Sequence, residues 1–434
     1  MSHKRRICIL LCMTIAVYSI VSTYLYSSPY SKRTIKKPTD KVCAGVTARN
    51  VITALQGNRV FIVSPYHDPR KQNVTRVLGI VHHEQVKELY CYFCNSTKSV
   101  HIVKAEIDIH EDRFGFPYGL ADIICPEPPN SNAKYIYLHG SKVNNLTGLT
   151  KFRIQNQEFP PYSANFTVCI STMFGNYNNT LQFIQTIEMY KLLGAQKVTL
   201  YLKSCTPQIQ TVLNYYIKEG TLEVIPWPID QYLKPSPRWN YNNDNTEIGY
   251  YGQMTTLNDC IYRNMYRSKY VLLNDVDEII LPFKHQNWEK MMESLQEQHK
   301  DVGIFRFENH IFPQTVATEG NFSDISSWKE VPGFNILQYI YREPDRKDYF
   351  NAQKMIVDPR KVIQTSVHSV LKSDGVSIDV PLDVALVYHC RTPLQKNLPK
   401  NLLIEDKNIW RYSNSLIKNV NKALNKIALK TTKR

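Results

Sequence analysis

The chain has 434 residues, of which 43% are hydrophobic and 21% charged, and this balance excludes wholesale disorder. Its formal net charge is +15, yet lysine and arginine are spread along the chain with an excess in the tail. No zinc-finger, RNP or helix-turn-helix motif accompanies them, so we expect no nucleic-acid partner. An anionic small substrate or a membrane surface fits the charge equally well.

The N-terminus predicts a membrane anchor. Residues 7–25 carry no charge and would rise about 28 Å as a helix, close to the ~30 Å of a bilayer core. The basic block at residues 3–6 holds that end in the cytosol. We expect a cytoplasmic tail (1–6), a transmembrane signal anchor (7–26) and a stem (27–50), which is single-pass type II topology. A cleaved signal peptide is the alternative, although the apolar run is long for one.

Sequons and cysteines indicate that the remainder lies in the secretory lumen, with the Golgi as the expected compartment. Eight cysteines lie outside the predicted span, an even number that suits disulfides in an oxidising compartment. Cys91 and Cys94 have the spacing of a redox or zinc motif, but no second such pair accompanies them, so we expect structural disulfides. Six Asn-X-Ser/Thr acceptors occur, at Asn73, Asn95, Asn145, Asn165, Asn178 and Asn321.

Residues 51–160 predict a small β-rich luminal domain. Short runs of β-branched and aromatic residues recur there, separated by Pro, Asn, Asp and Gly. The predicted strands are 60–63, 77–81, 89–93, 100–103 and 135–138.

From about residue 166 the pattern changes to alternating strands and helices. Four such repeats predict an α/β fold, a Rossmann-like, mostly parallel sheet with helices on both faces, over residues 161–400. The basic tail, 401–434, reads as an amphipathic helix from residue 413, packed on the domain or alternatively on anionic lipid head groups. The predicted strands are 166–170, 198–202, 222–225, 270–274, 302–307, 354–357 and 384–388, and the predicted helices are 180–193, 208–218, 256–267 and 288–298.

The acidic pair Asp275 and Asp277 closes the apolar run 270–274. Hard divalent cations such as Mn²⁺ or Mg²⁺ prefer carboxylate oxygens and commonly bridge them to a substrate diphosphate. Ligands of doubly wound sheets bind beyond the carboxyl ends of strands, where this pair lies. The pair therefore predicts a metal and diphosphate site, which is the chemistry of a nucleotide-sugar glycosyltransferase.

Several motifs, in order, resemble those of glycosyltransferase family 92 and cover roughly residues 165–395. The resemblance implies a GT-A type fold, a type II membrane topology, and β-linked transfer of galactose from UDP-galactose to glycan acceptors. Cys390 departs from the family's His-aromatic-Arg pattern, which bears on packing or disulfide pairing. The matching segments are 166–170, 183–190 with Gly194, Gly252-Gln253, Asn258-Asp259-Cys260, 273–278 with Pro282, 354–357 with Pro359, Val367-His368 and 388–391.

The resemblance also implies roles for the acidic pair. Asp275 is expected to contact the nucleotide sugar and Asp277 to bind the metal, with Mn²⁺ as the expected ion and a UDP-sugar as the donor. GT-A sites often add a late histidine ligand. His389 is our choice because it ends a predicted strand, and His368 is the alternative. The candidates for pairing with phosphate oxygens are Arg391 and Lys354.

An inverting transfer also requires a general base to take the proton of the acceptor hydroxyl. The leading candidates are Glu308, at the end of predicted strand 302–307, and Asp348 in the following loop. Glu343 and Asp345 are further candidates for this base.

These expectations describe a type II membrane glycosyltransferase that transfers a hexose, galactose by resemblance, to a glycan acceptor with inversion. Two other classes stay open. One is a catalytically inactive, lectin-like luminal protein of the same fold. The other is a two-carboxylate glycoside hydrolase, which would cleave glycans without a metal.

Overall fold

The computed structural model describes residues 43–431, apart from 58, 95–99, 321, 324, 347–350 and 397. The predicted anchor at 7–26 and the base candidate Asp348 lie outside the described residues. Within the described ranges, no helix combines the length and apolarity needed to cross a membrane.

Two five-stranded sheets form the N-terminal β-rich part. Apolar side chains from both sheets, including Val77, Ile123 and Ile136, share one core, so the sheets pack face to face. The first sheet has the order β2 (Thr53–Ala54), β3 (Phe61–Asp68), β4 (Val74–His82), β8 (Tyr118–Pro126), β7 (Glu106–Ile109). The second has the order β1 (Val46–Thr47), β10 (Thr150–Arg153), β9 (Tyr135–His139), β5 (Tyr90–Cys94), β6 (Val100–Lys104).

Disulfides hold these sheets together, as the cysteine pattern predicts. Cys91 on β5 is bonded to Cys125 on β8, and Cys94 is bonded to Cys43. The two cysteines of the CxxC motif therefore take different partners and form structural disulfides. Cys205 and Cys390 are free thiols.

The larger sheet is mixed. Five of its strand pairings are parallel and three are antiparallel. The parallel half was predicted, whereas the antiparallel pairings join strands far apart in sequence. The order is β13 (Leu222–Pro226), β12 (Lys197–Leu202), β11 (Ala164–Met173), β14 (Ser268–Asn274), β18 (Gln353–Val357), β16 (Val302–Pro313), β22 (Ala385–Arg391), β15 (Glu278–Pro282), with β21 (Val376–Asp379) beside β16.

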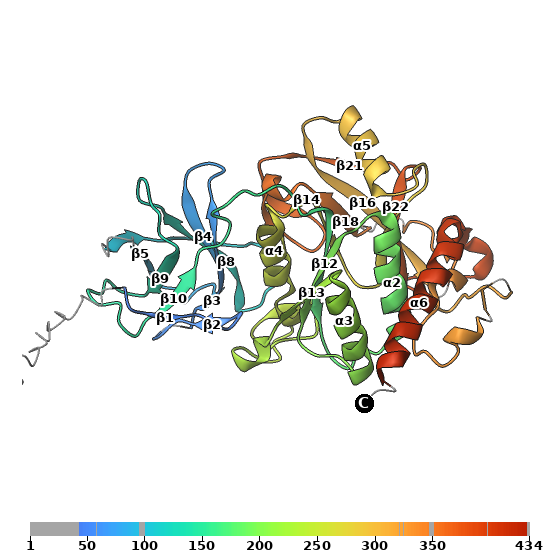
Figure 1. The fold of residues 1–434 in the computed structure, drawn as a ribbon, viewed down its shortest axis with the longest axis horizontal. Helices are drawn as coiled ribbons and strands as arrows, with labels where there is room; N and C mark the ends of the chain where they lie inside the picture. The colour runs from blue at the N-terminus through green and yellow to red at the C-terminus, as the bar shows by residue number, and fades with distance from the viewer. Residues whose placement is uncertain are drawn as a thin grey trace, which may run out of the picture. The chain divides into compact units, whose positions relative to one another are not determined.

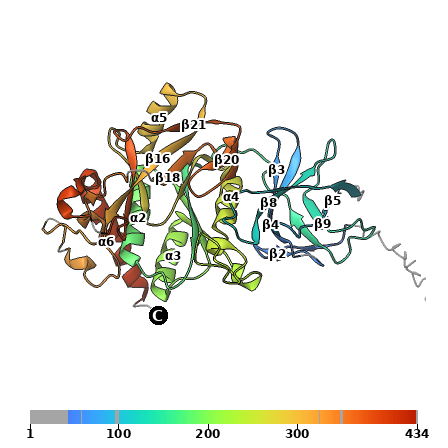
Figure 2. The ribbon, with the colours of Figure 1, turned by 180° about the vertical axis from the view of Figure 1, so that it is seen from behind.

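Both faces of this sheet are covered, because alternate strand residues point to opposite sides. On β14, Leu272 joins the core shared with α2 (Thr180–Leu193), α3 (Pro207–Glu219), α5 (Trp288–Gln298) and α6 (Ser413–Thr431). Its neighbour Leu273 joins the core shared with α4 (Gln253–Asn264) and the N-terminal sheets. Figure 1 shows α2, α3 and α6 together on one side and α4 on the other, and Figure 2 shows the same arrangement from behind.

Two predicted strand ends that bear on the site need correction. The strand expected to end at residue 307 continues as β16 to Pro313, because its second half gains β22 as a partner. Glu308 therefore lies inside the strand instead of at its end. His389 likewise lies within β22, which continues to Arg391.

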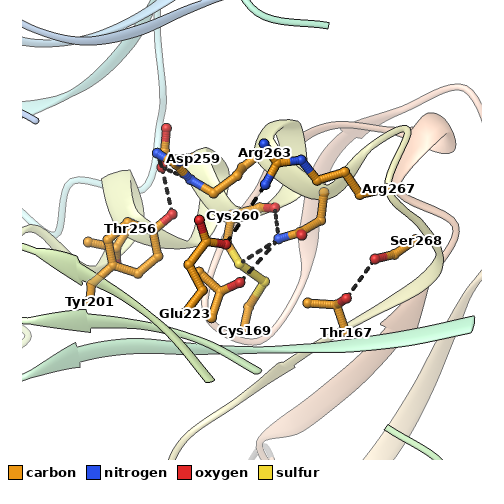
Figure 3. Close-up of a disulfide and its surroundings, with 12 residues drawn as sticks. Thr167, Cys169, Tyr201, Glu223, Thr256, Asp259, Cys260, Arg263, Arg267 and Ser268 are labelled. Carbon is orange, nitrogen blue, oxygen red and sulfur yellow. Dashed lines mark hydrogen bonds and ion pairs between the residues drawn. A yellow bond between two sulfur atoms is a disulfide. The ribbon is translucent and has the colours of Figure 1, made fainter. Parts of the chain in front are cut away.

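A third disulfide, Cys169–Cys260, ties β11 to α4 (Figure 3). Its cysteines are 91 residues apart in sequence and fully buried, so the bond closes a long loop of the unfolded chain. We expect the Cys169→Ala/Cys260→Ala double variant to lose about 2–4 kcal/mol of unfolding free energy. Urea denaturation followed by tryptophan fluorescence measures this loss. The free thiol Cys205 supplies the control, because Cys205→Ser should change stability by less than ~0.5 kcal/mol.

Candidate functional site

The acidic pair lies in a tight turn that joins β14 to β15. The backbone N–H of Asp275 donates to Glu278 Oε2 (2.8 Å), and the backbone N–H of Glu278 donates to the carbonyl of Asp275 (3.2 Å). The hydroxyl of Tyr190, from α2, donates to the carbonyl of Glu278 (2.6 Å). Glu278 is buried, so it fixes the shape of the turn and acts through its neighbours.

Lys354, from β18, neutralises the carboxylate of Asp275. Its ammonium lies 2.8 Å from Asp275 Oδ2 and 2.9 Å from Glu278 Oε2, and its side chain is buried. Burial would lower the pKa of Lys354, but Asp275 and then Glu278 raise it above its usual value. Burial alone would raise the pKa of Asp275, and Lys354 lowers it to about 2. The ammonium of Lys354 is thus paired with two carboxylates, whereas we expected it to pair with phosphate oxygens.

The second carboxylate, Asp277, meets the predicted histidine. His389 Nε2 lies 3.2 Å from Asp277 Oδ2. His389 reaches this position because β22 pairs with β15, which sets it opposite Glu278. Burial would lower the pKa of His389, but Asp277 and then Glu278 raise it. Asp277 therefore carries a negative charge beside a hydrogen-bonded imidazole.

Asp277 and His389 fit a divalent cation. Bonds of about 2.1 Å in an octahedral shell place neighbouring ligands roughly 3 Å apart, and these two ligand atoms are 3.2 Å apart. His389 Nδ1 lies 3.1 Å from the side-chain amide of Asn309 and 3.3 Å from Glu278 Oε1, which are the outer contacts that orient a ligating imidazole. A carboxylate with an imidazole suits an ion such as Mn²⁺, whose remaining positions phosphate and water can fill.

Asp275 does not join that pair. In the part of the chain that the structure describes, one set of three His, Cys, Asp or Glu residues brings its ligand atoms within 4.8 Å of one another. It consists of Glu308, His310 and Asp345. Asp275 instead keeps its Oδ1 within 3.4 Å of Ser171 and Gln253 and its Oδ2 on Lys354.

A cavity of about 810 Å³ opens beside the turn, within the range of small-molecule sites. The predicted site residues that line it are Asp275, Glu343, Asp345, His368, His389 and Arg391, whereas Asp277, Lys354 and Glu308 are not part of its lining. Arg391 is exposed there, so its guanidinium can reach a phosphate. His368 instead has Nδ1 3.0 Å from the carbonyl of Gln353. Burial, and secondly the charge of Lys354, lower the pKa of His368.

Two of the candidate bases, Asp345 and Glu343, line the cavity. Asp345 lines the cavity and its side chain is 54% exposed, and it lies near Glu308 beside the buried His310. Burial, and secondly Asp345, raise the pKa of Glu308. Glu343 also lines the cavity, but it is buried and accepts from the backbone N–H of Gln395 (3.0 Å).

A strained segment borders the same cavity. Tyr250 and Tyr251 have φ values of 43° and 51°, and Gly252 follows at 76°. A non-glycine residue in this region costs about 1–3 kcal/mol, and such strain collects at functional sites. The ring of Tyr250 lines the cavity and meets Phe174 edge-on, with centroids 5.4 Å apart. Sequence alone gives no signal for this conformation beyond the glycine.

Comparison with known proteins identifies the family of the chain. The sequence profile of glycosyltransferase family 92 matches residues 164–427. Among curated Caenorhabditis elegans proteins, the chain is 25% identical over 203 residues to "Glycosyltransferase family 92 protein F13G3.3", covering 46% of this chain and 37% of that protein. It is 26% identical over 137 residues to "Beta-1,4-galactosyltransferase galt-1", covering 30% and 29%. The chain thus spans about a third of the length of these relatives.

Solved structures resemble the chain only weakly. The Staphylococcus aureus TarS 1–349 crystal structure and its complex with UDP have TM-scores of 0.28 and 0.29, with 13% sequence identity. Each match covers 52% of this chain and 60% of that one. At this level of similarity they do not bear on the activity.

Proposed function

Because the chain belongs to glycosyltransferase family 92, we propose that its cavity transfers a hexose from a UDP-sugar to a glycan acceptor. The observation that carries this proposal is the Asp277–His389 pair, 3.2 Å apart, next to a cavity lined by Asp275 and Arg391. Galactose is the proposed sugar, supported by the relative named as a β-1,4-galactosyltransferase.

The donor's diphosphate belongs at the acidic turn. A Mn²⁺ held by Asp277 and His389 would neutralise charge on the departing diphosphate. Arg391, exposed in the cavity, pairs with phosphate oxygens. Asp275, fixed by Lys354, orients the nucleotide sugar against the wall. These residues are held before the substrate binds, so little reorganisation is needed during transfer.

We assign the general base to Asp345, supported by Glu308. Among the cavity carboxylates, Asp275 and Glu278 hold Lys354 and Glu343 is buried, whereas Asp345 is 54% exposed. Its neighbour Glu308 has a pKa raised by burial and then by the charge of Asp345, so Glu308 is the weaker candidate. Asp345 can then accept the proton of an acceptor hydroxyl as it attacks the sugar carbon opposite the leaving UDP, which inverts that carbon.

Asp345→Asn should lower kcat by about 10²–10⁴, because the acceptor hydroxyl loses its base. UDP affinity should stay within twofold, since the partners of Asp345 are His310 and Glu308 and not the residues proposed to bind the diphosphate. Steady-state kinetics and UDP titration measure the two quantities. Glu308→Gln should have the smaller effect, and the exposed Asp301 gives the control Asp301→Asn. Full activity in Asp345→Asn would show that Asp345 is not the general base.

We also propose the Golgi lumen as the site of action, with type II membrane anchoring. Three disulfides support an oxidising compartment. The four sequon asparagines that the structure describes are all exposed, as glycosylation requires: Asn73, Asn145, Asn165 and Asn178.

A UDP-sugar screen tests the proposed function. The full chain, solubilised in detergent, is incubated with each UDP-sugar, Mn²⁺ and an array of N-glycans, and released UDP is measured. We expect acceptor-dependent UDP release with one donor, abolished by EDTA. UDP binding without turnover of any donor would favour the lectin-like alternative. Glycan cleavage that persists in EDTA would favour a hydrolase.

A further inference from the structure

Two exposed aromatic side chains stand at the same cavity as the acidic turn. Trp239 is 64% exposed and Phe114 is 37% exposed, and their rings meet at right angles with centroids 5.9 Å apart. Both line the cavity with Asp275 and His389. Large aromatic side chains left in solvent together commonly mark a binding surface.

The position of Phe114 is built into the fold. It lies in the loop between β7 and β8 with φ 54°, a conformation that costs an aromatic residue about 1–3 kcal/mol. The backbone N–H of Tyr241 donates to its carbonyl (3.2 Å). Two residues on, buried Phe116 packs against the ring of Tyr241 at 5.5 Å. The loop between β7 and β8 and the segment that carries Trp239 therefore pack against each other.

We propose that Trp239 and Phe114 form a platform that binds a sugar ring of the acceptor glycan, an inference that rests on the proposed function. Pyranose rings present C–H groups on their faces, which pack on aromatic rings, while their hydroxyls remain free at the edge. The platform carries no charge, whereas a UDP-sugar brings its diphosphate to Asp277, His389 and Arg391.

A nucleobase is the competing occupant, and the geometry disfavours it. Tyr250 lines the cavity, and burial and then the nearby charge of Asp275 raise its pKa, so it belongs to the donor end. Trp239 is 64% exposed, so a glycan attached to a larger molecule can reach it from solvent. Phe114 precedes the family-matched segment 164–427, so the N-terminal β-rich part contributes directly to acceptor choice.

The test uses the full chain and its Trp239→Ala and Phe114→Ala variants. We expect the acceptor KM to rise at least tenfold, while UDP affinity and UDP-sugar hydrolysis without acceptor stay within twofold. Trp239→Phe should retain most of the acceptor affinity. Phe159, 56% exposed and absent from the cavity lining, gives the matched control Phe159→Ala.

Other outcomes overturn the platform. A loss of UDP affinity with an unchanged acceptor KM would assign the aromatic pair to the nucleobase. No change in either quantity would leave the pair without a role in binding. If the wild-type chain transfers no sugar, the proposed function is wrong, and this outcome by itself does not decide whether the platform binds glycans. Quenching of Trp239 fluorescence by N-glycans, compared with Trp239→Ala, then decides whether the platform binds glycans.

Discussion

Asp277→Asn should reduce kcat/KM for glycosyl transfer by about 10²–10⁴ in the presence of Mn²⁺. The change replaces an anionic metal ligand with a neutral amide and removes the carboxylate that lies 3.2 Å from His389. Charge on the leaving diphosphate would then lack several kcal/mol of stabilisation. Stability should change little, because the Asp277 side chain is 31% exposed and an amide in its place can still hydrogen-bond to His389. UDP release measured over donor concentrations below and above KM at saturating acceptor, with a thermal melt in parallel, measures both effects.

The matched control is Asp301→Asn, which removes an exposed carboxylate before the first residue of β16 and should leave the rate unchanged. A folded Asp277→Asn protein with more than a tenth of wild-type activity would contradict the role given to this carboxylate. Excess Mn²⁺ should recover part of the lost rate if the damage lies in metal affinity.

Asp259→Ala should cost about 3–5 kcal/mol of unfolding free energy, the largest stability effect that we expect. The buried carboxylate accepts from the hydroxyls of Tyr66 (2.7 Å) and Tyr201 (2.6 Å) and pairs with Arg263 at 3.0 Å. Figure 3 shows Asp259 on α4 with Arg263 and Tyr201 around it. Its loss leaves a mostly buried guanidinium and two hydroxyls without their partner.

The hydrogen bonds of Asp259 also join the N-terminal sheets to the mixed sheet. Tyr66 comes from β3 of the N-terminal sheets and Tyr201 from β12 of the mixed sheet, so one carboxylate on α4 holds both. Urea denaturation of the full chain measures the loss, and Tyr66→Phe, which removes a single hydrogen bond, should cost about 1 kcal/mol. A change below 1 kcal/mol in Asp259→Ala would show that packing alone holds these elements.

The parallel half of the sheet could be predicted because its signals are local. The bounds of α2 and α5 agree with the prediction, 180–193 and 288–298, since apolar residues recur at helical spacing in each, although α2 is buried on nearly all sides. The pairings of β18, β16 and β22 depend on contacts across long stretches of chain, which no local pattern encodes. For the same reason the extension of β16 past residue 307 was missed.

The site residues, too, divide into those that a local sequence pattern predicts and those that only the fold brings together. Asp275 and Asp277 could be found because they end a buried strand, and His389 was chosen by the same reasoning. The partner of Asp275 could not be found, because Lys354 reaches it only through the antiparallel register of β14 and β18. Phe114 and Trp239 lie in loops without periodicity, and only the structure brings them to one cavity. Asp259 belongs to a family motif, yet its burial shows a structural role.

The proposed metal site is tested most directly by electron paramagnetic resonance of Mn²⁺ bound to the full chain with UDP. A directly coordinated imidazole produces nitrogen modulation of the Mn²⁺ spin echo. We expect this modulation in the wild type, its loss in His389→Asn, and its retention in His368→Asn, whose side chain lines the same cavity. Absence of nitrogen coupling in the wild type, or its persistence in His389→Asn, would contradict the proposed metal site.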